Sequence, residues 1–327
     1  MKCKFCNTTV EKPTFDIGNT AISNDLIPKD RLNSLEKTYP LIFYVCPLCL
    51  LAQTEQYKEG YEIFGDDYVY FSSCSSYWLK HAKQYVEDIT TRLNLGKSSF
   101  VLEIASNDGY LLTNFVEKNI KCLGIEPTGS TAQEAIKKDV PTIVDFFNLE
   151  LASKLEKEGS QADLVIANNV LAHVPDIKNF VAALKKVLKK DGIITIEFPH
   201  LLSIIEKNEF DTIYHEHFFY FSVLALVKIF SKYNLSIYDL DELETHGGSI
   251  RVYVAHTDSN TNKNSDKENL DRILNKEISS SELLEYYISR VEKFNPDINA
   301  IIVKDYENAK LAALRADDEL SKGNIMG

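Results

Sequence analysis

The chain contains 327 residues, which is enough for two or three domains with a sizeable hydrophobic core. Its net charge of −12 argues against an extended nucleic-acid-binding surface. The longest apolar region, residues 218–230, is too short to span a bilayer and predicts a buried helix. Because the N-terminal residues also lack the pattern of a signal peptide, we expect a cytoplasmic protein with no nucleic-acid or membrane partner.

Four of the six cysteines form two pairs of equal spacing, with two residues between the members of each pair. In a chain that is not expected to be secreted, this pattern indicates a tetrahedral metal site more often than disulfides, and thiolate ligands favour zinc. Four protein ligands leave no open position, so the predicted zinc is structural. A redox-active pair is the less favoured alternative, because neither pair opens a helix in a βαβ pattern. The predicted ligands, all in a zinc-binding module of residues 1–60, are Cys3, Cys6, Cys46 and Cys49.

Residues 61–257 combine a long helical pattern, over residues 78–95, with a series of alternating strands and helices. Within this series, Asp191-Gly192 follows the helical residues 185–190 and predicts a turn. The alternating order predicts an α/β domain with a parallel sheet that helices cover on both faces. The predicted strands are Phe100–Ile104, Lys121–Ile125, Pro141–Val144, Leu164–Ala167, Gly192–Phe198, Leu235–Leu240 and Ser249–Ala255.

The turn after the first of these strands predicts a ligand site. An apolar run ends near Glu103, and a second apolar run ends in Glu126, at the spacing of an acid that binds ribose in such units. The turn contains one glycine, Gly109, and therefore lacks the Gly-rich pattern that holds a pyrophosphate. S-adenosylmethionine has ribose but no phosphate and fits both conditions; the alternative is an ordinary α/β sheet with an acidic strand end. The predicted cofactor-binding residues are Glu103, Ala105, Ser106, Asn107, Asp108, Gly109, Glu126, Asp145 and Asn168.

A second polar segment, Tyr214-His215-Glu216-His217, lies between apolar neighbours and does not have a core pattern. In an extended conformation, Tyr214 and Glu216 would face one side and the two histidines the other. A glutamate beside an imidazole would raise the pKa of that imidazole and fix its tautomer. The alternatives are a polar loop with surface histidines and, less favoured, a metal site that uses His215 and His217.

The C-terminal part differs from the rest in composition. Residues 258–276 are polar and rich in Asn and Ser, which predicts a linker. In residues 277–327, a capping-box pattern from Ser279 to Glu282 predicts a helix to about Phe294, and a second helical pattern covers 309–322. The predicted domains are 1–60, 61–257, 258–276 and 277–327.

Several motifs in one order give residues 1–257 a resemblance to the sugar C-methyltransferase family, which methylates a carbon of nucleotide-linked 4-keto-6-deoxy sugars. Ala105 stands where that family usually has Gly, which predicts a tighter turn. The motifs are the two cysteine pairs, Tyr39-Pro40-Leu41, Glu103–Gly109, Gly124–Pro127, Asn168–Pro175, Tyr214–His217 and His246–Tyr253.

The resemblance implies a Rossmann-like class I methyltransferase sheet with a small N-terminal zinc module, followed here by a helical tail. It implies S-adenosylmethionine as cofactor, a nucleotide-linked sugar as partner and a role in deoxysugar biosynthesis. By the same resemblance His217 is the catalytic base, Tyr214 and Glu216 hold the sugar or tune the imidazole, and His173 is a second catalytic or orienting imidazole. The candidate substrate-binding residues are Tyr68 and Tyr70.

The last fifty or so residues resemble instead the N-terminal helices of the amidase signature family. In that family the catalytic lysine and serines lie beyond this stretch, so amidase activity is not expected. Sugar C-methyltransferases normally continue into a second α/β lobe, for which this tail has no matching pattern. Two alternatives therefore stay open: a truncated remnant that binds zinc and S-adenosylmethionine, or an O- or N-methyltransferase of another small molecule. The oligomeric state is not predicted.

Overall fold

A computed structural model describes most of the chain. The chain forms two compact units, Met1–Lys267 and Glu268–Gly327. Among the described residues, no helix is both long and apolar enough to cross a bilayer. The described residues are 1–24, 26–27, 29–58, 60–63, 70–263, 270, 274, 285, 288–289, 292–293 and 305–321.

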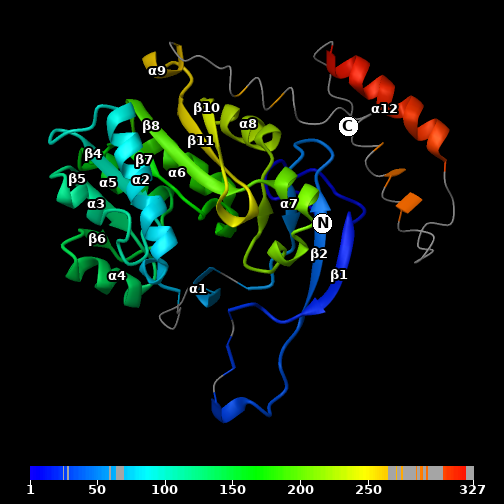
Figure 1. The fold of residues 1–327 in the computed structure, drawn as a ribbon, viewed down its shortest axis with the longest axis horizontal. Helices are drawn as coiled ribbons and strands as arrows, with labels where there is room; N and C mark the ends of the chain where they lie inside the picture. Colours follow the sequence, from blue (N-terminus) through cyan, green and yellow to red (C-terminus); the bar gives the residue numbers. More distant parts are fainter. Residues whose placement is uncertain are drawn as a thin grey trace. The chain divides into compact units, whose positions relative to one another are not determined.

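A seven-stranded sheet forms the centre of the first unit (Figure 1). Its order is β6-β5-β4-β7-β8-β11-β10. The first five strands in this order pair in parallel, whereas β11 is antiparallel to both of its neighbours. The strands are β4 (Phe100–Ile104), β5 (Lys121–Ile125), β6 (Thr142–Ile143), β7 (Ala162–Ile166), β8 (Leu188–Pro199), β10 (Leu235–Leu243) and β11 (Ser249–His256).

The prediction of a parallel sheet is therefore right for five strands and wrong for β11. A parallel pair needs a long crossover, but β10 and β11 are joined by residues 244–248 alone, which only an antiparallel pair allows. A second difference concerns the predicted turn at Asp191-Gly192, which lies inside β8. The pairing of β7 with β8 shifts register between Ala162 and Leu164, so a bulge takes the place of the turn.

Helices follow most strands of the parallel part, as the alternating pattern predicted. Asn148, Asp176 and Ser222 cap three of them by accepting hydrogen bonds from backbone N–H groups of the first turn. The helices of this unit are α1 (Gly60–Ile63), α2 (Ser76–Arg92), α3 (Thr113–Glu117), α4 (Gly129–Lys137), α5 (Leu149–Lys157), α6 (Ile177–Val187), α7 (Leu201–Lys207), α8 (Val223–Ser231) and α9 (Asn260–Lys263). Short 3₁₀ turns cover 29–31, 72–74, 171–173, 210–212 and 245–247.

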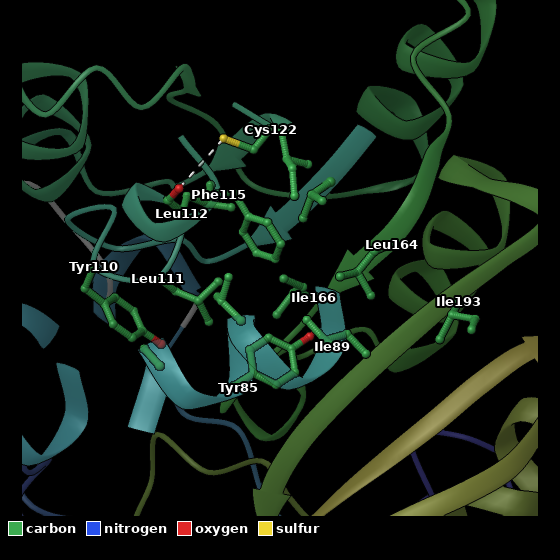
Figure 2. Packing of buried hydrophobic residues seen from close by; sticks show 14 of the residues in the cluster. Tyr85, Ile89, Tyr110, Leu111, Leu112, Phe115, Cys122, Leu164, Ile166 and Ile193 are labelled. Carbon is green, nitrogen blue, oxygen red and sulfur yellow. Dashed lines mark hydrogen bonds between the residues drawn. The ribbon is translucent and has the colours of Figure 1, made fainter. Parts of the chain in front are cut away.

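The main core lies between α2, α3 and one face of the large sheet (Figure 2). Tyr85 and Ile89 of α2 pack with Phe115 of α3 against Leu164 and Ile166 of β7. All but one of the β7 side chains are buried, which explains why this strand has a continuous rather than an alternating apolar pattern. This packing fixes the carboxyl ends of β4 and β7 as the rigid base of the site described below.

The zinc module contains a second, antiparallel sheet of order β1-β2-β3-β9. Three strands come from the N-terminal segment: β1 (Phe15–Thr20), β2 (Tyr39–Val45) and β3 (Ala52–Thr54). The fourth, β9 (Phe219–Tyr220), comes from far along the chain. The prediction of one buried helix over 218–230 is therefore wrong in its first part, because Phe219 pairs with Gln53 and the Ser222 cap starts α8 only at Val223.

The second unit contains α12 (Tyr306–Ser321), close to the second helix predicted for the tail. The predicted capping box from Ser279 to Glu282 and the end of the first helix at Phe294 lie outside the described residues. The first residues of the predicted linker form α9, where the N–H of Asn260 donates to Asp191. Residues 264–269 of that linker also lie outside the described part of the chain.

Candidate active site and metal centre

The two cysteine pairs converge on one point of the N-terminal module. The four sulfur atoms lie within 4.8 Å of one another, with Cys3 and Cys49 3.5 Å apart and Cys6 and Cys46 3.4 Å apart. Tetrahedral zinc with Zn–S bonds of about 2.3 Å separates its sulfur ligands by about 3.8 Å, so the arrangement fits the ion. The hydrogen bond between Cys49 and Cys3 lowers the pKa of Cys3 and raises the pKa of Cys49, as expected for two neighbouring thiols that share a proton.

Both halves of this centre have the same local geometry. The N–H of Asn7 donates to the carbonyl of Cys3, and that of Leu50 donates to the carbonyl of Cys46, each over 3.0 Å. Asn7 and Leu50 are both left-handed, with φ of 62° and 63°. Each Cys-x-x-Cys segment thus forms the same turn, which directs both of its thiols to one side. The two segments together therefore place four thiols around one centre.

A cavity of about 970 Å³ opens at the carboxyl ends of the parallel strands. It lies where the strand order reverses, because β4 is followed along the sheet by β5 on one side and β7 on the other. Its lining includes five carboxylates and, among the described residues, no lysine or arginine. The cavity therefore favours a ligand with positive charge. The acids are Glu126, Asp176, Glu209, Asp211 and Glu216.

The turn after β4 forms one wall of the cavity. Asn107 lies at its tip with φ of 50°, and its amide accepts from the N–H of Ser72 at 2.9 Å and donates to the carbonyl of Tyr70 at 3.0 Å. Gly109 follows with φ of 74°, and a Cβ there would lie 3.0 Å from Ala135 in α4. The turn thus closes tightly against α4 while it holds the segment that precedes α2.

Glu126 lies at the end of β5 and connects two backbone segments. Its carboxylate accepts from the N–H groups of Asn107 and Thr128, both over 2.9 Å. Burial raises the pKa of Glu126, whereas these two hydrogen bonds lower it in part. The side chains of Thr128 and Thr131 also hydrogen bond to Glu126, so ribose hydroxyls in the cavity that it lines would have to replace these donors.

The predicted cofactor residues separate into two groups. Ala105, Asn107, Glu126 and Asn168 line the cavity. The other five are not in its lining: Glu103, Ser106 and Asp108 are buried beneath the turn, Gly109 lies within it, and Asp145 is exposed.

Sequence reasoning missed several residues of the lining. Phe146, Phe147 and Asn148 lie next to Asp145, and the aromatic pair directly after a strand is a signal that could have been used. Asn169 was also missed, although its side-chain nitrogen and oxygen and Asn168 Oδ1 are buried and have no hydrogen-bond partner among the described residues. Polar atoms in this state are expected to pair with a bound ligand.

The segment from Tyr214 to His217 is a turn, and the prediction of an extended segment is wrong. The N–H of His217 donates to the carbonyl of Tyr214 at 3.1 Å, which closes four residues and brings the first and last side chains together. The Tyr214 hydroxyl lies 2.9 Å from His217 Nε2. The rings of His173 and His217 meet edge to face with centroids 4.6 Å apart. We call His173, Tyr214 and His217 the imidazole cluster.

Hydrogen bonds to carbonyls define the tautomers of this cluster. His217 Nδ1 donates to the carbonyl of Thr212 at 3.2 Å, and His173 Nδ1 donates to the carbonyl of Glu216 at 2.9 Å. In the neutral rings, Nε2 therefore carries the lone pair. Burial lowers the pKa of His173 to about 4 and holds the pKa of His217 well below its usual value, so both rings are neutral at pH 7.

Glu216 points away from the imidazoles, which corrects a second prediction. Its carboxylate accepts from the backbone N–H and the side-chain amide of Asn24, at 2.9 and 2.6 Å. It is therefore bound to the zinc module and does not raise the pKa of His217. His215 also faces the module, where its Nε2 donates to the carbonyl of Pro40 at 3.1 Å.

Among the described residues, the four cysteines are the only cluster of three or more potential metal ligands, so His215 and His217 do not form a second metal site. Tyr70 lines the cavity, whereas Tyr68 lies outside the described residues. Trp78, Tyr110 and His246 also line the cavity and were not selected from the sequence.

Comparisons with known proteins agree with this architecture. A family model described as a methyltransferase domain matches residues 78–240, and one described as a "Putative zinc binding domain" matches residues 3–64. The C-methyltransferase NovU of Streptomyces niveus is 30% identical over 254 residues, which are 78% of this chain and 60% of NovU. The chain thus spans less than two thirds of the length of this curated relative.

Solved methyltransferase structures also match the chain. Magnesium protoporphyrin IX methyltransferase of Synechocystis PCC 6803, with bound SAH, shares 16% identity over 59% of this chain and 90% of that chain, with a TM-score of 0.43. An S-adenosylmethionine-dependent methyltransferase of Clostridium acetobutylicum shares 13% identity over 54% of this chain and 91% of that chain, also with a TM-score of 0.43. From the matched domains, the strand order and the four-cysteine centre, we conclude that the chain contains a methyltransferase domain of Rossmann-like class I fold, with a zinc-binding domain ahead of it.

Proposed function

We propose that this protein methylates a carbon next to the ketone of a nucleotide-linked 4-keto-deoxy sugar. The observation that carries the proposal is the imidazole cluster, which offers neutral bases in the same cavity as the predicted ribose-binding acid Glu126. Methyl transfer to carbon needs such a base, because a proton must leave the carbon before it can attack. The C-methyltransferase NovU, which is 30% identical, supports carbon as the acceptor.

The cavity divides into a cofactor end and an acceptor end. Glu126 would hold the ribose, Phe146 and Phe147 would cover the adenine, and the turn around Asn107 would hold the methionine part. When bound, S-adenosylmethionine supplies an electrophilic methyl group on a sulfonium. The carboxylates of the lining stabilise this positive charge, and Asn168 supplies an acceptor that lacks a partner among the described residues.

The described lining has no cation for a diphosphate, so only the keto sugar would enter the acceptor end, where His217 would act as the base. Its Nε2 lone pair takes the proton from the carbon next to the ketone, and the electron pair of the broken C–H bond delocalises onto the ketone oxygen as an enolate. Thr212 fixes the tautomer that makes Nε2 basic. The Tyr214 hydroxyl donates to this nitrogen in the free protein, so it would have to release the lone pair before the base acts. His173 packs against the ring of His217 and prevents it from turning. The low pKa of His217 ensures that the base is unprotonated at pH 7.

Mass spectrometry of a panel of nucleoside-diphosphate 4-keto-6-deoxyhexoses, incubated with the protein and S-adenosylmethionine, tests the proposed reaction. We expect one sugar to gain the mass of one methyl group. If folded protein that binds the cofactor methylates none of them, the remnant alternative or a different acceptor replaces the proposal.

The His217→Ala variant tests the base. Loss of a positioned general base should lower turnover by roughly 10²- to 10⁴-fold and leave the affinity for S-adenosylmethionine unchanged. The control is His256→Ala, because His256 is partly buried at the end of β11 and does not line the cavity. Undiminished turnover in His217→Ala would indicate an O- or N-methyltransferase, which needs no carbon base.

A further inference from the structure

His246 has a strained backbone at the edge of the cavity. Its φ of 48° and ψ of 44° lie in the left-handed region, which costs about 1–2 kcal/mol for a residue with a Cβ. The structure around it fixes this conformation. The N–H of Gly248 and the Ser249 hydroxyl both donate to the carbonyl of Thr245 at 2.9 Å, and the N–H of His200 donates to the carbonyl of Gly248 at 3.0 Å.

The two residues after His246 are glycines with positive φ, and a Cβ on either would displace a neighbouring side chain. A Cβ on Gly247 would collide with the carboxylate of Glu209, and a Cβ on Gly248 would lie 2.6 Å from Ser203 Oγ. Lys207 also donates a hydrogen bond to the carbonyl of Gly247. The strand start is therefore packed on both sides, and the strain at His246 is maintained by its neighbours. Strain held in this way often marks a functional position.

The imidazole of His246 packs against Trp78, which in turn stacks on His81; we call these two side chains the wall. The imidazole meets the ring of Trp78 edge to face, with centroids 5.2 Å apart, and Trp78 stacks on His81 at 4.9 Å. Beneath them lies the fully buried Glu197, which accepts from His81 Nε2 at 2.9 Å and from the hydroxyl of Thr245 at 3.2 Å. The buried carboxylate of Glu197 thus holds both Thr245, which precedes His246, and His81, which stacks on Trp78.

Arg251 stabilises the ionised form of Glu197. Its guanidinium donates to Glu197 over 2.6 Å, and both side chains are buried. The hydrogen bonds and charges of His81 and Arg251 lower the pKa of Glu197 against the opposing effect of its burial. The wall is therefore preorganised, as a site that stabilises a transition state requires.

The ring of His246 itself is open to the cavity. It is more than one third exposed, it lines the cavity, and none of the described residues makes a hydrogen bond to its nitrogens. His217 and His246 both line the cavity, so the two imidazoles share one space. Burial by neighbouring atoms lowers the pKa of His246, which favours the neutral ring. A neutral imidazole has one N–H that can donate a hydrogen bond.

An enolate needs a donor as well as a base, and no lysine or arginine lines the described cavity. We propose that His246 is a further catalytic residue, whose imidazole N–H donates to the acceptor oxygen that becomes the enolate. Proton removal by His217 and charge stabilisation by His246 then occur on two sides of the same carbon acid. This inference rests on the proposed function, because only a carbon acceptor forms an enolate.

The test is the exchange of the carbon-bound proton in D₂O, measured by NMR on the sugar of the panel that the wild type methylates. S-adenosylhomocysteine replaces the cofactor, so that exchange is read without methyl transfer. His246→Phe keeps a ring against Trp78 but has no donor, and exchange should fall by roughly 10²- to 10³-fold. His246→Asn keeps an N–H donor and tolerates the left-handed conformation, so it should restore most of the exchange. His256→Phe is the matched control outside the cavity.

The outcomes are distinct. Loss of exchange in His246→Phe, rescue in His246→Asn and unchanged affinity for S-adenosylhomocysteine in both support the assignment. Unchanged exchange in His246→Phe overturns it, as does a loss that is confined to cofactor affinity or equal in both variants. If the wild type neither exchanges nor methylates any sugar of the panel, the proposed function fails, and the assignment of His246 fails with it.

Discussion

Glu126 is a buried polar side chain that acts on the backbone. Both of its oxygens accept backbone N–H groups, one from the turn after β4 and one from the start of α4. A carboxylate in this position joins two strand ends before any ligand binds. Its contribution to cofactor binding must therefore be tested with a substitution that preserves its shape, because Ala would leave two buried donors unpaired and Gln leaves one.

Glu126→Gln should lower the affinity for S-adenosylmethionine by roughly 10- to 100-fold, since hydrogen bonds from ribose to a charged acceptor contribute about 1.5–3 kcal/mol. Isothermal titration calorimetry measures the change. The control is Glu134→Gln, because Glu134 lies on α4 outside the cavity lining and pairs only with Lys137 at the surface. Equal affinities of both variants and the wild type would show that Glu126 does not hold the ribose.

At the scale of elements, the turn after β4 has an unusual backbone. Ala105, Asn107 and Gly109 all have positive φ, of 56°, 50° and 74°. Asn and Gly tolerate this region well, but Ala does not, because its Cβ approaches the following carbonyl. We therefore infer that the backbone of Ala105 is strained, in line with the tighter turn expected at this position.

Ala105→Gly should therefore stabilise the protein by roughly 1 kcal/mol, because relief of the left-handed strain exceeds the added flexibility of the unfolded chain. Chemical denaturation of the two proteins measures the difference. Ala152→Gly is the control: this residue lies inside α5, where glycine should destabilise the fold. Destabilisation by both substitutions would mean that Ala105 is not strained.

At the scale of the whole first unit, the zinc module is continuous with the acceptor end of the cavity. Asn24 holds Glu216, and Pro40 accepts from His215. The Thr54 hydroxyl donates to the carbonyl of His217 at 2.8 Å. β9 extends the module's sheet directly after this segment. The zinc module therefore contacts the turn Tyr214–His217 directly, and we expect a bound zinc ion to influence the position of this turn.

Removal of zinc should consequently reduce methyl transfer more than it reduces affinity for S-adenosylmethionine, whose predicted ribose contact, Glu126, lies at the end of β5. Elemental analysis should find about one zinc per chain in the wild type and less in Cys46→Ser. Cys74→Ser should keep the metal, because Cys74 is exposed and outside the cluster. Full turnover by zinc-free protein would contradict the coupling.

The sequence alone predicted those features that depend on local spacing. β4 and β5 match their predicted bounds, because each is a short apolar run between clear breaks. The four cysteines were identified by spacing, and His173, Tyr214 and His217 by resemblance; the structure brings each set together. The roles of the site residues and the domain boundaries remain predictions.

Only the tertiary structure decided which residues meet across long distances in the chain. Whether a glutamate tunes an imidazole or binds a loop, as Glu216 binds Asn24, depends on a contact between residues 192 positions apart. The strand β9 and the wall behind His246 have the same origin, whereas the turn at Tyr214–His217 is closed by its own backbone. Local pattern determines secondary structure because neighbouring side chains share one backbone, whereas a cavity is formed by residues that no local pattern relates.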